Sequence, residues 1–179
     1  MQGRCGANAP VRCKAPSDAF GIASIGKNYR KKGEVYGFDG GKKVKGRKRH
    51  ILVDTLGLLL KVIVTEGNGS ERINGLALLL ESQEHIERLK LIWVDQGYQG
   101  ERFERAVEHL SSATVEVMKR QGKGFQLLAR RWVVERTFAW LIKKRRLIVD
   151  YEQLPETSES LIYLAMVHLM LKKLTSYPV

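Results

Sequence analysis

The run from Leu89 to Val94 constrains the fold more than any other stretch of this sequence. It reads LKLIWV, is short and largely apolar, and stops abruptly at Asp95-Gln96-Gly97-Tyr98. A strand of this composition is typical of a sheet that is covered on both faces, as in α/β proteins. The chain is therefore expected to form a sheet with helices packed on both sides.

The remaining periodicity agrees with this architecture. Residues 51–53 and 58–65 predict an antiparallel hairpin whose first arm is basic, and residues 114–118 predict a further strand. Helices are predicted after Ser70, over 101–110, over 130–146 and from Ser158 to Leu174, with Ile73, Leu76, Ala77 and Leu80 on the packing face of the first. Residues 1–32 lack periodicity and are expected to be irregular or disordered. The predicted class is mixed α/β.

Charge points to a polyanionic partner. Lys and Arg number 31 against 19 Asp and Glu, which gives a net charge of +12 and a pI of about 9.9. The positive charge is clustered in residues 42–49 and 130–146. Neutralising phosphates releases condensed counterions, so such clusters favour nucleic acid, although a solvated basic face is the plainer reading. The candidate phosphate-binding residues are Lys42, Lys43, Lys45, Arg47, Lys48, Arg49, Arg131, Arg136, Lys143, Lys144, Arg145 and Arg146.

Asp95 is the first candidate for chemistry. It follows a buried strand and precedes a glycine turn, which is where α/β sheets expose their sites. A turn-forming Asp is the plainer alternative. Hard cations such as Mg²⁺ bind few, well-fixed carboxylate oxygens, so a carboxylate at this place is a candidate metal ligand.

Glu135 is the second candidate. It is the one carboxylate in the basic stretch 130–146, and on a helix Val134, Phe138 and Leu141 would form the packing face. A salt-bridged surface Glu is the plainer alternative. Cleavage of a phosphodiester by two metals about 3.5–4 Å apart needs carboxylates to hold both.

Three segments carry a resemblance to a known family. GFDGGKKVKGRKRHILVDTLGLL, LIWVDQGYQG and RRWVVERTFAWL followed by RRL, DYE and LPETSE look like a bacterial insertion-sequence DDE transposase of the fourth-and-fifth-family type. The similarity runs from Gly33 to Leu174. It implies an RNase H-like mixed sheet with flanking helices, in which three acidic residues bind two Mg²⁺ (or Mn²⁺) ions. Such enzymes cut element ends and transfer 3′-hydroxyls into target DNA, generally as multimers.

The resemblance assigns two acids and leaves one missing. By motif, Asp95 is the second acid and Glu135 the Glu, with Arg131, Arg136 and Trp140 in the same signature. The first Asp belongs near residues 22–25, where the chain reads IASI. We interpret this as a truncated or frameshifted copy that recovers the family pattern near Lys31. Residues 33–179 are then an incomplete catalytic domain.

Several alternatives stay open at this stage. Asp54, and less favourably Asp39, could supply a third metal ligand, although both also suit turns. The chain could be a DNA-binding remnant without catalysis, or a metal-dependent nuclease without strand transfer. An RNA-binding domain lacks support, because no aromatic RNP-like motif is visible. His50 is expected in the basic strand, Trp93 and Trp132 in the core, and Tyr98 either in the core or against DNA.

The sequence also predicts a location. It contains no apolar stretch of about 18 residues and no signal-like apolar segment near its start. Cys5 and Cys13 fit no common zinc spacing and are expected to be free thiols. We therefore expect a cytoplasmic protein.

Overall fold

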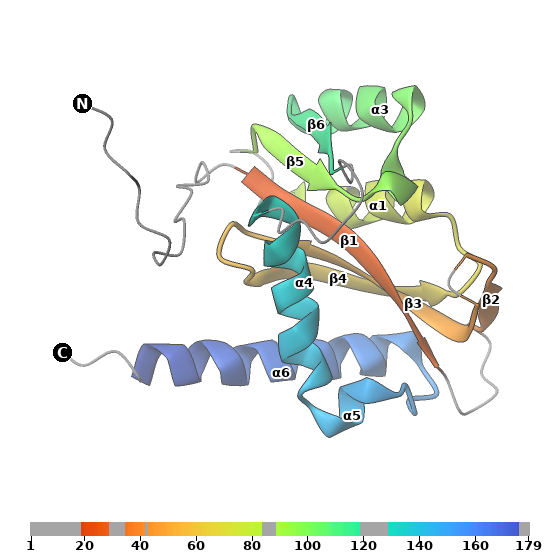
Figure 1. The fold of residues 1–179 in the computed structure, drawn as a ribbon, viewed down its shortest axis with the longest axis vertical. Coiled ribbons are helices and arrows are strands. Elements are labelled where there is room, and N and C mark those ends of the chain that lie inside the picture. The colour runs from red at the N-terminus through yellow and green to blue at the C-terminus, as the bar shows by residue number, and fades with distance from the viewer. Residues whose placement is uncertain (1–18, 29–34, 42, 84–88, 119–128, 176–179) are drawn as a thin grey trace, which may run out of the picture.

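A single mixed sheet organises the chain. The structure is a computed structural model that describes residues 19–28, 35–41, 43–83, 89–118 and 129–175. The sheet has the order β2-β3-β1-β5-β6, with β4 also paired to β3. Its strands are β1 (Ala19–Asn28), β2 (Gly37–Asp39), β3 (Val44–Val53), β4 (Leu59–Glu66), β5 (Leu91–Val94) and β6 (Thr114–Val117). The mixed α/β class is thus confirmed (Figure 1).

The centre of the sheet lies in a segment that was expected to be irregular. β1 pairs antiparallel with β3 and parallel with β5, and it is buried from Ala19 to Ala23. The expectation of an irregular arm over residues 1–32 is therefore wrong for residues 19–28; residues 1–18 and 29–32 lie outside the described part. Pairing on both sides forms this strand, since its own Gly, Ala and Ser residues have weak strand preference.

Helices cover both faces of the sheet. On one face, α1 (Glu71–Leu80) and α3 (Glu101–Ser111) enclose a core that includes Ile22, Leu52 and Val94. On the other face, α4 (Ala129–Ile142) crosses β1, and α6 (Pro155–Thr175) packs along β4 (Figure 1). This second core includes Ala23 and Val53. The site therefore lies in a layered α/β frame.

Two details of the helices differ from the sequence predictions. In α1 the buried residues are Gly75, Leu78 and Leu79. Ile73 is 68% and Leu80 48% exposed, so the predicted packing face is wrong for these two residues, whereas Leu76 does pack against the core. The predicted helix 130–146 ends at Ile142 and is followed by a separate turn, α5 (Arg145–Ile148).

The last helix also begins earlier than predicted. Pro155 is the first residue of α6, a position that suits proline because its missing N–H has no helical partner there. Ser158, the predicted cap, lies inside the helix and donates its Oγ hydrogen bond to Asp150 Oδ2 at 3.0 Å. Ser158 thus ties α6 to the segment that precedes it.

Two buried arginines of β3 hold that same segment. Arg47 is 1% exposed and donates to the carbonyls of Val35 (2.8 Å), Glu152 (2.8 Å) and Gln153 (2.6 Å). Arg49 is 2% exposed and donates to Leu147 O at 2.7 Å. Both guanidinium groups approach Asp150 Oδ2, at 3.8 and 4.0 Å. β3 therefore fixes α5 and the start of α6.

Among the described helices, none is both long enough and apolar enough to cross a membrane.

Candidate acidic site

Asp95 continues the line of β5 beyond its last paired residue. Its backbone is extended, with φ −75° and ψ 164°, and its side chain accepts a hydrogen bond from Gln96 N at 2.8 Å. That bond caps the 3₁₀ turn η1 (Gln96–Tyr98). The predicted place, at the carboxyl end of a buried strand, is confirmed; a role in chemistry stays a prediction.

Glu135 lies on the exposed side of α4. The predicted packing face is confirmed, because Val134, Phe138 and Leu141 are 3%, 9% and 4% exposed. The apolar spacing thus turns Glu135 away from the core.

The turn between β3 and β4 fixes the rotation of α4. Thr137 Oγ1 donates to Gly57 O and Arg136 Nη2 to Leu56 O, both at 2.7 Å. Gly57 has φ +76°, and a Cβ there would lie 2.8 Å from Thr137 Oγ1. A residue without a side chain is therefore required for this docking of α4.

β1 lies between the elements that carry the two acids. Ile22 pairs with Val94 in the parallel ladder, one residue before Asp95. On the α4 side, a Cβ at Gly21 would lie 2.8 Å from Val134 Cγ2, one residue before Glu135. The fold therefore brings Asp95 and Glu135 to the same short stretch of β1 from two directions.

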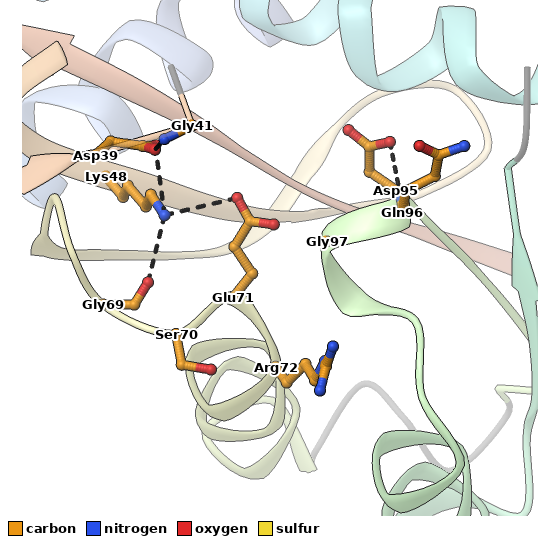
Figure 2. A pocket seen from close by; sticks show the side chains of 10 residues that line it. All are labelled: Asp39, Gly41, Lys48, Gly69, Ser70, Glu71, Arg72, Asp95, Gln96 and Gly97. Carbon is orange, nitrogen blue, oxygen red and sulfur yellow. Dashed lines mark hydrogen bonds and ion pairs between the residues drawn. The ribbon is translucent and has the colours of Figure 1, made fainter. Parts of the chain in front are cut away.

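A polar pocket of about 730 Å³ opens beside Asp95. Lys48 Nζ lies 3.4 Å from Asp39 Oδ2, 3.7 Å from Glu71 Oε1 and 3.3 Å from Gly69 O (Figure 2). Figure 2 shows Asp95 and Gln96 at the other side of the same pocket. The ammonium group thus already neutralises carboxylates in this pocket.

Glu71 was missed by the sequence analysis. It lies in the first turn of α1 and accepts a hydrogen bond from Ser24 Oγ at 2.8 Å. A Cβ at Gly97 would overlap its carboxylate, which explains the glycine after Asp95-Gln96. The only local signal was an acid at a helix start, which is too common to indicate a pocket.

His50 and Tyr98 form a buried polar pair behind the pocket. His50 Nδ1 lies 3.0 Å from Tyr98 Oη, and His50 Nε2 lies 3.0 Å from Thr65 Oγ1. Both residues are fully buried. Burial, and then the charge of Glu71, raise the pKa of the Tyr98 hydroxyl well above its usual range. Tyr98 therefore packs in the core, and the alternative that it touches DNA is wrong.

Asp54 lies toward the other end of the sheet. Val53 pairs with Gly21, and β3 runs antiparallel to β1, so Asp54 lies beyond Gly21 in the direction away from Asp95. Its Oδ1 accepts hydrogen bonds from Leu56 N (2.9 Å) and Leu58 N (2.7 Å). Asp54 therefore serves as a turn residue, and the suggestion that it supplies the third metal ligand stays a prediction.

We expect Asp54→Asn to stabilise the fold at neutral pH. Burial raises the pKa of the Asp54 carboxyl, so its favourable contribution is present below the ordinary carboxyl pKa and is lost as pH rises through the folded value. Asn keeps the turn acceptor and does not ionise. Urea unfolding at several pH values should show the variant more stable near neutrality and equal to wild type in acid. A constant difference across pH contradicts this account.

The transposase DDE domain family matches residues 13–170. The chain belongs to that family. Its first matched residue precedes β1, so the expectation that the family pattern is recovered only near Lys31 is wrong.

A known protein similar to this transposase DDE domain agrees with the assignment. A putative transposase for insertion sequence element IS402 of Burkholderia cepacia is 34% identical over 116 residues, 60% of this chain and 54% of that protein. The chain thus spans about half of that relative's length.

Solved structures show the fold of the transposase DDE domain. The catalytic core domain of BIV integrase superposes with a TM-score of 0.56 at 17% identity, over 86% of this chain and 83% of that chain. A simian T-cell lymphotropic virus intasome, in complex with PP2A regulatory subunit B56 gamma, gives a TM-score of 0.56 at 18% identity, over 92% and 52%. These likenesses confirm the predicted RNase H-like fold.

The basic residues of this transposase domain divide into two sets. Arg47, Lys48 and Arg49 are at most 7% exposed and are held by carbonyls and carboxylates of the fold. Burial lowers the pKa of the Arg49 guanidinium, and the charge of Asp150 acts in the opposite direction. Their low exposure and their partners within the fold show a structural role, and a contact of these three residues with phosphates stays a prediction.

The second set is accessible. Its members with exposed side chains are Lys43, Lys45, Lys143, Arg145 and Arg146, and Lys144 is half-buried. Arg146 Nη2 lies 3.5 Å from Glu152 Oε1. Lys42 and the side chain of Arg131 lie outside the described residues. The accessible candidates are thus Lys43 in the turn before β3, Lys45 near the start of β3, and residues 143–146, and their contact with phosphates stays a prediction.

Two tryptophans of α4 enclose Arg136. The Arg136 Cζ lies 4.4 Å from the Trp132 ring centroid and 5.0 Å from that of Trp140, and Lys173 Nζ lies 4.0 Å from the Trp140 centroid. Trp132 is 41% exposed, so its predicted place in the core is wrong; Trp93, at 1%, is confirmed there. The Arg136 guanidinium therefore interacts with both rings as well as with Leu56 O, and its contact with a phosphate stays a prediction.

Proposed function

We propose that this chain binds DNA as the RNase H-like domain of an insertion-sequence transposase, with Asp95 and Glu135 as its acidic pair. The observation that carries the proposal is the approach of both acids to one stretch of β1 from β5 and α4. The surplus of positive charge and the accessible basic residues support a DNA partner. Element ends, target DNA, self-association and a cytoplasmic location stay predictions of the sequence.

Strand transfer by two metals requires several carboxylates close together. In the part of the chain that the structure describes, no three His, Cys, Asp or Glu side chains gather closely enough to hold a metal ion. Glu71 and Asp39 already face the Lys48 ammonium, and Asp54 lies on the β3 side of β1, beyond Gly21 in the direction away from Asp95. The donor set therefore does not fit a pair of Mg²⁺ or Mn²⁺ ions, and binding without strand transfer is the function that we favour.

A metal-dependent DNA cleavage activity is the second candidate, because Asp95 and Glu135 are both retained beside β1. Manganese-dependent nicking of duplex DNA that is lost in Asp95→Asn would distinguish this candidate from a domain that only binds.

The binding proposal predicts a specific salt dependence. Removing Lys143 and Arg145 together by alanine should weaken duplex binding and reduce the slope of log affinity against log salt by about 0.9 for each phosphate that is no longer neutralised. Fluorescence anisotropy over a salt series measures both quantities. The matched control is Arg102→Ala with Arg105→Ala, which removes the same charge from exposed residues of α3 on the opposite face. Equally weakened binding in the two double variants would mean that net charge alone drives association with DNA.

A further inference from the structure

The backbone pairing identifies the β1 residue that lies beside Asp95. The parallel ladder runs from the pair Ala19–Leu91 to the pair Ile22–Val94. Asp95 keeps an extended backbone, so one further step in the same register puts Ala23 beside it.

The two faces of β1 have different neighbours at this level. Ala23 is 8% exposed and packs in the core that contains Val134 and Phe138 of α4. Ser24, the next residue, points the other way and donates to Glu71 of α1. Of these two residues, therefore, Ala23 is the one on the α4 side, where Glu135 lies.

Asp95 belongs to that same side by alternation. Trp93 pairs with Gly21, and a Cβ added at Gly21 would point toward Val134. Two residues along an extended backbone return a side chain to the same face, so Asp95 shares the face of Trp93, Gly21 and Ala23.

We propose that Ala23 occupies the position from which a third carboxylate would complete a divalent-cation site between Asp95 and Glu135, and that its methyl group is what leaves the site incomplete. The inference rests on the proposed acidic pair. A methyl group offers no oxygen, whereas hard cations require carboxylate or carbonyl oxygens. Because the backbone of β1 is held on both sides by strand pairing, a carboxylate at this position would be presented on a rigid element.

Ala23→Asp in the full chain tests the proposal through manganese binding measured by isothermal titration. Even outer-shell partners alter metal affinity by about 10- to 100-fold, so a direct ligand should raise affinity at least that much over wild type. A manganese-dependent rise in the unfolding temperature should accompany it. Ala23→Asn, of the same size but uncharged, and Ser24→Asp, of the same charge but on the other face, should give neither effect.

Several results would overturn the proposal. A folded Ala23→Asp that gains no affinity, or a Ser24→Asp that gains as much, excludes position 23. If Ala23→Asp fails to fold, the wild-type chain still decides: saturable manganese binding that disappears in Asp95→Asn would show that the site is already complete. If Ala23→Asp also raises manganese affinity in a chain that carries Asp95→Asn, the acidic pair of the proposed function is contradicted. DNA binding with an unchanged salt dependence in every variant would leave the proposed binding role intact.

Discussion

Arg47→Met should lower the free energy of unfolding by about 3–5 kcal/mol, the cost of breaking a buried charge pair from one side. The guanidinium group donates to three backbone carbonyls and lies 3.8 Å from Asp150 Oδ2, and its side chain is fully buried. Methionine fills much of the same space but satisfies none of these groups. Urea unfolding followed by circular dichroism measures the change.

The control for Arg47 is its exposed neighbour on the same strand. Lys45→Met removes one charge from an exposed side chain and should change stability by no more than about 0.5 kcal/mol. If Arg47 bound phosphates, as its place in a basic run suggested, Arg47→Met would instead keep its stability and lose DNA affinity. Equal unfolding midpoints for the two variants contradict the structural role.

Phe138→Ala should cost about 3–5 kcal/mol, the usual loss for a buried phenylalanine. Phe138 is 9% exposed and packs α4 against the core that contains Ala23. The cavity would lie under the helix that carries Glu135, so amide hydrogen exchange should accelerate in α4 more than in α1. Urea unfolding and exchange mass spectrometry measure the two effects.

Trp132→Ala is the matched control on the same helix. It also truncates an aromatic ring, but that ring is 41% exposed, and its contact with Arg136 is duplicated by Trp140. The loss of stability should be about 0.5–1 kcal/mol. A Trp132→Ala variant as unstable as Phe138→Ala would show that the surface aromatic residues, rather than the core, anchor α4.

The spacing of apolar residues predicted those strands and helices whose apolar face packs on the core. β5, α3, β6 and the buried face of α4 follow from apolar runs and spacing, and the place of Asp95 follows from the end of β5. The buried residues of α1 were predicted wrongly in part, because apolar side chains lie on most sides of this helix. Ile73 and Leu80 could therefore not be distinguished from the buried residues.

Features that depend on distant partners could not be predicted. β1 is a strand because two other strands pair with it, and its own sequence, AFGIASIGKN, gives little sign of that. The burial of Arg47 depends on carbonyls more than a hundred residues away, so a run of basic residues suggested a surface. The family resemblance put the missing acid only near residues 22–25, and strand register was needed to propose Ala23 within that range.

The position of β1 has a consequence for how the chain reaches its native state. Among the described strands, β1 alone joins the antiparallel group β2, β3 and β4 to the parallel pair β5 and β6. The β3–β4 hairpin closes locally, but β1 must find Leu91–Val94 across the whole of β2, β3, β4 and α1. Such non-local pairing slows folding, because the entropy of closing the long loop is lost before the strand contacts contribute any stabilising energy. The two halves of the sheet should thus form separately, with the insertion of β1 as the late step that assembles Asp95 beside the α4 layer.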